Sequence, residues 1–430
     1  MSDTANISVN VNNNAYKNDV LVLRELAKQT MEIASQDVQN ERRALWRDFN
    51  SLRTYRVPVY ILDPHCMWRE VFSEKELRCE DELFRRYENW LRLKLYHSSF
   101  GDDFIVEPWI TVTPEYSDAN PPDWLTWGVH IDIERLADTL AMYFHDAPVE
   151  TPDDLQKLIP PRGIIDREAT ARKKSMLEDA VGDILPVVSD NYPPAVCGLA
   201  YTLSYLLGPE KMLYQLHDQP DMVHEICRMV MDNSMKICDE AEKNGLFSNC
   251  DTTFLGNPQI QAMPYCHELP EPGPRRTVSI SQHWIYDCSQ EFECVGPEMW
   301  NEFVLSYQAP IYERFGLTAY GCCEGLTGKI PYLKRLKNLR RVAVTPWADD
   351  EACAAQLEDK YVVSWRPNPA EMVMQGFDPE RIKRVIRRAK EIYESHGCHW
   401  EINLKDFISV EYDRDRLRNW VRVAREALEG

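Results

Sequence analysis

Hydrophobic positions in the first hundred residues change from a helical to an extended spacing and back again. Apolar residues recur every three to four positions over 19–49, which predicts helix. The apolar run over 57–62 ends in Asp63 and Pro64, and this pattern predicts a buried strand that leads into a loop. Residues 79–97 are rich in Glu, Leu and Arg and predict another helix.

The pattern loses its helical period over 101–161, where Trp, Pro and Asp are dense. Such a stretch predicts strands and loops rather than helices. We expect an insertion at about 100–165 that lies over one end of the main domain. It would serve either as a lid over a site or as a simple surface insertion.

Beyond residue 166 the pattern becomes regular. Helices are expected over 166–182 and 220–243, and Asp378 before Pro379 marks the start of a later helix. Short β-rich runs lie at Thr277–Ile280, Leu317–Tyr320, Val342–Thr345, Tyr361–Ser364 and Trp400–Leu404, and helical runs at 298–314, 328–338, 349–357, 379–395 and 413–428. This alternation predicts a parallel sheet covered by helices.

The phosphate-binding loops of a nucleotide-binding doubly wound sheet are missing, since no GxGxxG follows a strand and no GxxxxGK[ST] is present. The pattern therefore favours an α/β fold with a closed TIM (β/α)8 barrel over 57–430. A polar tail and N-terminal helices would precede the barrel over 1–56. A barrel of this kind has its active site at the carboxyl ends of the strands.

Charge and composition exclude several partners. The net charge of −20 repels phosphate backbones and anionic lipid surfaces, so neither nucleic acid nor a membrane is expected as a partner. The chain has no uninterrupted apolar stretch of about 20 residues that could span a membrane. Residues 1–19 are polar and Asn-rich, unlike a secretory signal. The 13 cysteines are scattered and odd in number, which is typical of thiols in a reducing cytoplasm.

The densest reactive cluster follows the expected strand Leu317–Tyr320. Tyr320, Cys322, Cys323 and Glu324 would lie at the catalytic end of a barrel. One cysteine together with Glu324 could hold a zinc ion that keeps an open position for catalysis. The alternative is that both cysteines are small packing residues in a tight turn.

A second cluster follows the expected strand Thr277–Ile280. His283, Asp287 and Cys288 could be metal ligands or acid–base groups, and each could instead be an ordinary core residue. Two further candidates, His65 and Cys66, follow the first expected strand.

The last expected strand, Trp400–Leu404, supplies a third cluster. Strand alternation sends Glu401 and Asn403 to one face, and Asp406 lies in the loop that follows. We therefore rank Asp406 and Glu401 above three residues that would lie at the opposite end of the strand. These are His396, Cys398 and His399.

The stretch 196–210, with Gly198, Thr202 and the turn 208–210, resembles the uroporphyrinogen decarboxylase superfamily. The family order of leucines, an acidic residue, a proline and a helix follows over 213–223. The resemblance resumes at 300–304, 315–320 and 401–428, and it covers roughly residues 165–428. It implies a TIM barrel, in agreement with the hydrophobic pattern.

Two branches of this superfamily differ in their motifs. The decarboxylases carry an Arg-Gln-Ala-Gly-Arg loop after the first strand, where this chain has 63–69 without that sequence. The zinc-dependent, corrinoid-linked methyltransferases carry His-x-Cys after a middle strand and a late cysteine. Here Tyr320 stands in place of that histidine, Cys322 matches the cysteine, and the late cysteine falls near Asp406. The resemblance thus implies zinc held by other ligands, with Cys322, Glu324, His283 and Asp406 as the substitutes.

The resemblance further implies a cytoplasmic methyltransferase. It would move a methyl group from a small donor, a methoxylated aromatic or a methylamine, to a corrinoid on a separate protein, or from a methyl-corrinoid to an acceptor. The chain has no Asp-x-His-x-x-Gly corrinoid loop of its own. The candidate catalytic residues are His283, Asp287, Tyr320 and Asp406.

Two other functions stay open at this point. One is a cofactor-free decarboxylase or other lyase of a small acid, for which Arg366 or Lys405 would face the pocket. The other is a non-catalytic binding barrel that has lost its chemistry, which the replaced histidine of the His-x-Cys motif favours.

Overall fold

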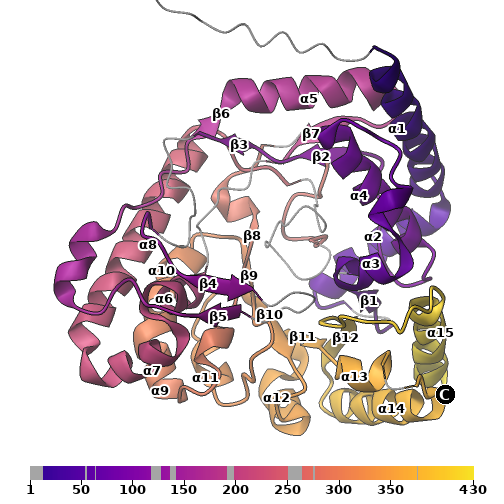
Figure 1. Ribbon diagram of the computed structural model, residues 1–430. Coiled ribbons are helices and arrows are strands. Elements are labelled where there is room, and N and C mark those ends of the chain that lie inside the picture. Colours follow the sequence, from indigo (N-terminus) through magenta and orange to yellow (C-terminus); the bar gives the residue numbers. More distant parts are fainter. Residues whose placement is uncertain are drawn as a thin grey trace, which may run out of the picture.

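The computed structural model describes residues 13–53, 56–62, 64–117, 127–135, 142–190, 198–249, 264–274, 277–374 and 376–430. Helices lie around the outside of the molecule, and most of the strands lie inside this layer (Figure 1). In the part of the chain that is described, no helix combines the length and apolar character needed to cross a membrane.

The central sheet has six parallel strands in the order β1-β12-β11-β10-β9-β8. They are β1 (Val59–Ile61), β8 (Trp284–Asp287), β9 (Leu317–Tyr320), β10 (Leu339–Val344), β11 (Val362–Trp365) and β12 (His399–Leu404). These strands are almost entirely buried, as expected of a parallel sheet covered by helices. Because all six run the same way, their carboxyl ends meet at one edge of the sheet, which we call the carboxyl edge.

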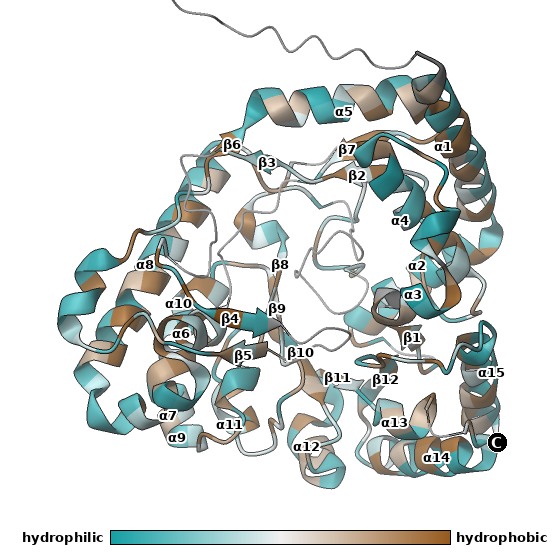
Figure 2. Cartoon of the chain, viewed as in Figure 1, coloured by the Kyte–Doolittle hydropathy of each residue, from teal (hydrophilic) through white to brown (hydrophobic). Residues whose placement is uncertain are grey.

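The helices that follow the later strands were well predicted by the hydrophobic pattern. They include α10 (Ser306–Tyr312), α12 (Asp350–Leu357), α14 (Pro379–Ser395) and α15 (Arg416–Glu429). Helix α14 begins where expected, because the Asp378 carboxylate accepts hydrogen bonds from two backbone N–H groups of its first turn. Figure 2 shows hydrophilic and hydrophobic residues alternating along α14 and α15, as expected of helices with one buried face.

The remaining elements precede or interrupt this series. The helices are α1 (Asn13–Ala34), α2 (Asp37–Asn50), α3 (Trp68–Val71), α4 (Glu82–Ser98), α5 (Arg167–Val181), α6 (Leu199–Leu207), α7 (Pro209–Asp218), α8 (Pro220–Lys243), α9 (Pro297–Trp300), α11 (Ile330–Leu333) and α13 (Pro369–Met372). The short strands are β2 (Ile110–Val112), β3 (Glu115–Tyr116), β4 (Ile133–Arg135), β5 (Met142–Phe144), β6 (Ile165–Asp166) and β7 (Val187–Ser189). The domain limits and the lid role predicted for 100–165 stay predictions.

The single helical run predicted over 19–49 is divided into α1 and α2. The backbone N–H and the hydroxyl of Ser35 both donate to the Met31 carbonyl, and α1 ends there. The new direction of α2 lets Trp46 pack edge-on against Tyr60 of β1. Packing against the sheet therefore decides the division, which hydrophobic spacing alone does not reveal.

The closed barrel predicted from the sequence is not formed by strand pairing among the described residues. β1 and β8 are the edges of the six-stranded sheet, and β2 and β7 form a separate parallel pair. At β1, side chains replace a neighbouring strand. The Asp103 carboxylate accepts from Val59 N–H at 2.9 Å, and the Asp102 carboxylate accepts from Ile61 N–H at 3.0 Å. The fold is therefore a mixed α/β structure with a curled parallel sheet.

The strand predicted at Thr277–Ile280 is also in a different place. Ile280–Gln282 forms a 3₁₀ turn with a capping box, and the strand is β8, all of whose residues are buried. The tertiary pairing of β8 with β9 overrides the extended pattern that precedes it. As a result His283 lies at the amino end of β8, while Asp287 and Cys288 lie at the carboxyl edge.

Candidate functional site

Loops from four strands of the central sheet bring reactive side chains together at the carboxyl edge. Cys288 follows β8, Cys322 and Cys323 follow β9, Arg366 follows β11, and Lys405 and Asp406 follow β12. We call these six residues the thiol cluster. The first and the last of them are more than a hundred positions apart in the chain, so only the parallel sheet makes them neighbours.

Cys322 is at the centre of the thiol cluster. Its Sγ lies 3.0 Å from the Lys405 Nζ and 3.5 Å from the Cys323 Sγ. Hydrogen bonds from the Cys288 and Cys323 thiols, and then the positive charges of Lys405 and Arg366, outweigh burial and hold the pKa of Cys322 well below its ordinary value. These groups therefore favour the thiolate form of Cys322.

Lys405 is the cation that contacts the thiols directly. Its side chain is only 4% exposed, and its Nζ lies 3.1 Å from Asp406 Oδ2. Burial and the neighbouring Arg366 oppose its charge, but Cys322, Asp406 and Cys323 outweigh them and raise the pKa of Lys405. The lysine thus carries a buried positive charge with a sulfur on one side and a carboxylate on the other.

The surroundings of Cys323 favour its protonated form. Its thiol donates to Asp406 Oδ2 at 3.3 Å, and its hydrogen bond to Cys322, together with burial, raises the pKa of Cys323. Asp406 has a φ of 61°, a left-handed conformation that is unusual for a residue with a side chain. With this backbone, the Asp406 carboxylate contacts both Cys323 and Lys405.

Glu324 holds the loop after β9 in place. One carboxylate oxygen accepts from the Ser289 N–H and the other from the Cys322 N–H, both at 2.8 Å. The same loop needs Gly321, whose φ is +104° and where an added Cβ would lie 2.6 Å from a Leu326 methyl. Glu324 therefore positions Cys322, and both of its oxygens are already engaged by the backbone.

Asp287 joins β8 to the surrounding helices. Its carboxylate accepts from the Tyr312 hydroxyl at 2.5 Å, from the Gln308 amide at 2.7 Å and from the Cys288 N–H at 2.8 Å. Burial raises the pKa of Asp287 to about 6, although these hydrogen bonds act in the opposite direction. Asp287 is therefore a buried carboxyl that titrates close to neutral pH.

Tyr320 belongs to the packed layer beneath the cluster. Its hydroxyl donates to Ser289 Oγ at 3.0 Å, and its ring packs edge-on against Trp300 and Tyr312. Burial raises the pKa of Tyr320 well above its ordinary value. These contacts support the loop after β8, and Tyr320 is not in the thiol cluster.

His283 is separated from the other predicted residues. It lies at the amino end of β8, and its ring nitrogens face the carbonyls of Trp284 at 2.7 Å and Ser248 at 2.9 Å. Burial lowers the pKa of His283. The sequence interpretation put it at the carboxyl edge because it assigned the strand to Thr277–Ile280, before His283 instead of after it.

The four residues predicted as zinc ligands, Cys322, Glu324, His283 and Asp406, therefore do not fit a zinc ion. His283 lies at the other end of its strand, both Glu324 oxygens are engaged, and Lys405 is the cation between Cys322 and Asp406. Within the described ranges, no three or more His, Cys, Asp or Glu side chains are grouped as a metal site. Zinc binding as such stays a prediction.

Arg366 and Lys405 were expected to face the pocket only for the alternative lyase function. Arg366 is 3% exposed, and it donates to the Cys322 carbonyl. The signal was present in the sequence, since the alternation that points Glu401 and Asn403 inward also points Lys405 inward. Glu401 itself lies deeper, in an ion pair with Arg341 at 2.5 Å, and does not reach the cluster.

The other candidates lie elsewhere or outside the described part. His399 is the first residue of β12, and His396 and Cys398 precede it, so all three are at the amino end as expected. Cys66 is half-buried in a 3₁₀ turn after β1. The side chain of His65 and residues 196–197 of the family-like stretch lie outside the described residues.

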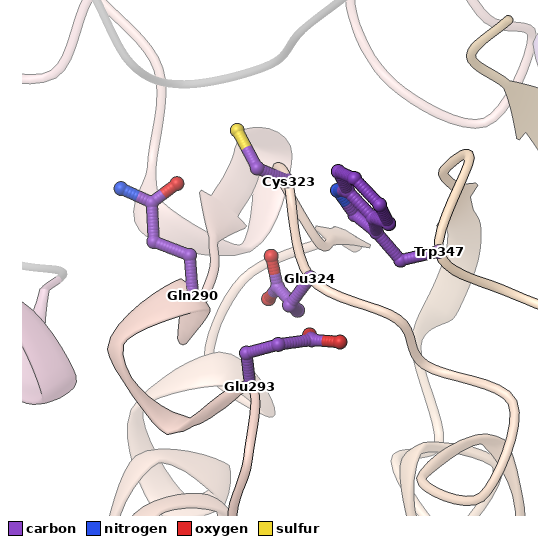
Figure 3. Close-up of a pocket in the computed structure, with 5 residues that line it drawn as sticks. All are labelled: Gln290, Glu293, Cys323, Glu324 and Trp347. Carbon is purple, nitrogen blue, oxygen red and sulfur yellow. The ribbon is translucent and has the colours of Figure 1, made fainter. Parts of the chain in front are cut away.

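An open pocket of about 310 Å³ adjoins the cluster. It is lined by Gln290, Glu293, Cys323, Glu324 and Trp347. Figure 3 shows the two carboxylates lying between Gln290 and Trp347, with the Cys323 thiol at one side. The pocket gives a small ligand access to the loop that carries Cys322.

Comparisons with known proteins give matches among solved structures and none by sequence family. No protein-family model matches the chain, and the search of curated proteins found no match. The fold is similar to a methyltransferase from Methanosarcina mazei, with a TM-score of 0.48 and 11% sequence identity, covering 89% of this chain and 97% of the other. At this TM-score and identity, the likeness assigns neither the fold nor the activity of this chain.

Proposed function

We propose that this protein is a methyltransferase in which the Cys322 thiolate takes the methyl group of a small methylated donor. The observation that carries the proposal is the position of Cys322, whose sulfur lies 3.0 Å from a buried lysine at the carboxyl edge of the sheet. The ionised form of a cysteine is its nucleophilic form, so this lysine keeps the sulfur ready to react. The sequence resemblance to corrinoid-linked methyltransferases supports the same class.

The transfer is a displacement at the methyl carbon. The Cys322 sulfur attacks, the carbon–sulfur bond forms as the bond from carbon to the heteroatom breaks, and the electron pair leaves with the heteroatom. The methylated sulfur is neutral. Lys405 would then keep Asp406, at 3.1 Å, as its partner, so the buried ammonium is not left unpaired after the reaction.

The methyl group must next leave Cys322 for a second acceptor. As the sequence suggested, we propose that this acceptor is a corrinoid on a separate protein. In the reverse direction, the methylated corrinoid would donate the methyl group. Since the predicted ligand set does not fit zinc, no step here passes through a metal. We also propose a cytoplasmic location, because thiols this close together need a reducing compartment.

The proposal is tested by incubating the protein with methoxylated aromatics and methylamines and mapping methylation by mass spectrometry. We expect methyl on Cys322, none after Cys322→Ser, and a rate about 10- to 100-fold lower after Lys405→Met. Cys398→Ser is the matched control, since Cys398 is a free thiol at the amino end of β12. Methylation of added cobalamin checks the second transfer. An unmodified Cys322 with every donor would rule the proposal out.

A second candidate function is a decarboxylase or other lyase of a small acid. It is favoured by Arg366, whose buried Nε has no hydrogen-bond partner among the described residues and whose guanidinium lies beside the Cys322 loop together with Lys405. Two buried cations of this kind could hold a substrate carboxylate. Release of carbon dioxide from a small acid, lost in Arg366→Met and accompanied by no methyl transfer, would favour this function over the first.

A further inference from the structure

We propose that the pocket beside Cys323 binds a methylated ammonium group, so that the methyl donor is a methylated amine rather than a methoxylated aromatic. This inference rests on the proposed function and names its substrate class. The pocket lies next to the reacting sulfur, because Cys323 lines it and the Cys323 Sγ is 3.5 Å from the Cys322 Sγ.

The charge of the pocket suits a cation. Two of the five described residues that line it are the carboxylates Glu293 and Glu324, and none of these five is Lys, Arg or His. Glu293 is fixed because one of its oxygens accepts from the Gly325 N–H at 2.6 Å. Glu324 is fixed by its two backbone donors. The carboxylates are therefore held in place before a ligand arrives.

Trp347 supplies the second, independent observation. It is 73% exposed, although Trp is a residue that globular proteins usually bury for most of its surface. Packing in the core therefore does not account for its position, and its ring lines the pocket (Figure 3). The face of an indole ring attracts cations, and the methyl groups of a methylated ammonium also make apolar contact with it.

The backbone keeps Trp347 at this place. Its N–H lies 3.4 Å from Thr345 Oγ1, and its carbonyl oxygen lies 3.1 Å from where a Cβ on Gly325 would be. Glycine at 325 thus allows the loops after β9 and β10 to approach closely. This approach brings the Trp347 ring and the carboxylates to the same pocket.

The chemistry favours a positively charged donor. When a thiolate takes methyl from a methylated ammonium, the negative sulfur and the positive nitrogen both become neutral, and the amine leaves without needing a proton. A methoxylated aromatic would instead release a phenolate in the pocket lined by Glu293 and Glu324. Lys405, 3.5 Å from the Cys323 sulfur, already has Asp406 and the thiols as partners, so repulsion from the two carboxylates disfavours that donor.

Binding is tested by titration calorimetry with choline and with dimethylbutanol, its neutral isostere. We expect choline to bind, the isostere to bind at least about tenfold more weakly, and Trp347→Ala and Glu293→Gln each to weaken choline about tenfold. Glu298→Gln is the matched control, because Glu298 is an exposed carboxylate of α9 that does not line the pocket. Equal binding of the two ligands, or unchanged binding in both pocket variants, would overturn the inference.

The same preparations separate this inference from the proposed function. If choline does not bind but a methoxylated aromatic methylates Cys322, the cation pocket is wrong and the methyltransferase stands. If choline binds as expected but no donor methylates Cys322, the pocket stands and the methyltransferase is wrong.

Discussion

The low pKa of Cys322 is caused by groups that follow three other strands, together with Cys323 from its own loop. The Cys288 thiol comes from β8, the Arg366 guanidinium from β11 and the Lys405 ammonium from β12. Each of them stabilises the negative sulfur, and together they outweigh the cost of burying it. A single cysteine in a loop becomes a nucleophile only because the sheet brings these groups to it.

The rate at which iodoacetamide alkylates Cys322 should depend on Lys405. In the unchanged protein we expect a rate that varies little across neutral pH, because the thiol is already ionised. In Lys405→Met the pKa of Cys322 should rise toward its ordinary value of about 8.5. The alkylation rate should therefore increase with pH across the neutral range. Peptide mapping at several pH values measures it. The same pH profile in both proteins would contradict the role given to Lys405.

Asp287 should make the protein less stable as pH rises through its folded pKa. That pKa is raised to about 6, above an unfolded value of about 3.9, so the folded state binds more protons between them. Protonated Asp287 contributes about 3 kcal/mol to the free energy of unfolding. This contribution is fully present below about pH 4 and is lost by about pH 7. Urea unfolding across this pH range measures the free energy of unfolding of the unchanged protein and of Asp287→Asn. Only the unchanged protein should lose this stability as pH rises.

At the scale of elements, the position of one strand decides the composition of the site. β8 begins several residues after the strand that hydrophobic alternation predicted. This shift moves His283 from the carboxyl end of the strand to its amino end and leaves Cys288 at the carboxyl end. It removes a predicted ligand from the carboxyl edge and keeps there the thiol that lowers the pKa of Cys322.

The loop after β9 should be intolerant of a side chain at Gly321. A Cβ there would meet Leu326 at 2.6 Å, and its φ of +104° strains any other residue. We expect Gly321→Ala to lower the free energy of unfolding by about 2 kcal/mol or more. In Gly296→Ala, where a Cβ would have open space, the change should be a few tenths of a kcal/mol. Urea unfolding compares the two variants, and similar losses in both would argue against a strained loop.

At the scale of the whole molecule, an ion pair inside the sheet connects its strands to the N-terminal helices. Arg341 of β10 contacts Glu401 of β12 at 2.5 Å and also Asn50 at the end of α2. Ser364 of β11 donates to the same Glu401 oxygen at 2.6 Å. This contact links the N-terminal helices to the core that supports the carboxyl edge.

Removing one partner of this pair should destabilise the protein strongly. Arg341→Met would leave the Glu401 charge buried without its cation, which typically costs about 3–5 kcal/mol. Arg422→Met, which breaks the exposed pair with Glu426, should cost no more than about 1 kcal/mol. The double variant Arg341→Met with Glu401→Gln should recover part of the loss in urea unfolding, and no recovery would argue against a charge effect.

Much of the architecture could be read from the sequence because it depends on local spacing. The hydrophobic stripe over 220–243 gives α8 with those limits, and the apolar run before Gly321 gives β9. Parallel strands separated by helices were also expected. These features follow from the periodicity of burial, which each segment carries in its own residues.

Only the tertiary structure decided which side chains meet. Lys405 and Cys322 are far apart in the chain, and the parallel order of β9 to β12 makes them neighbours. The same pairing puts His283 at the wrong end of its strand for the predicted site and leaves the sheet unclosed by strand pairing among the described residues. The sequence determined the segments because local periodicity governs them, and the pairing of distant strands decided the site because it governs which charges share a buried space.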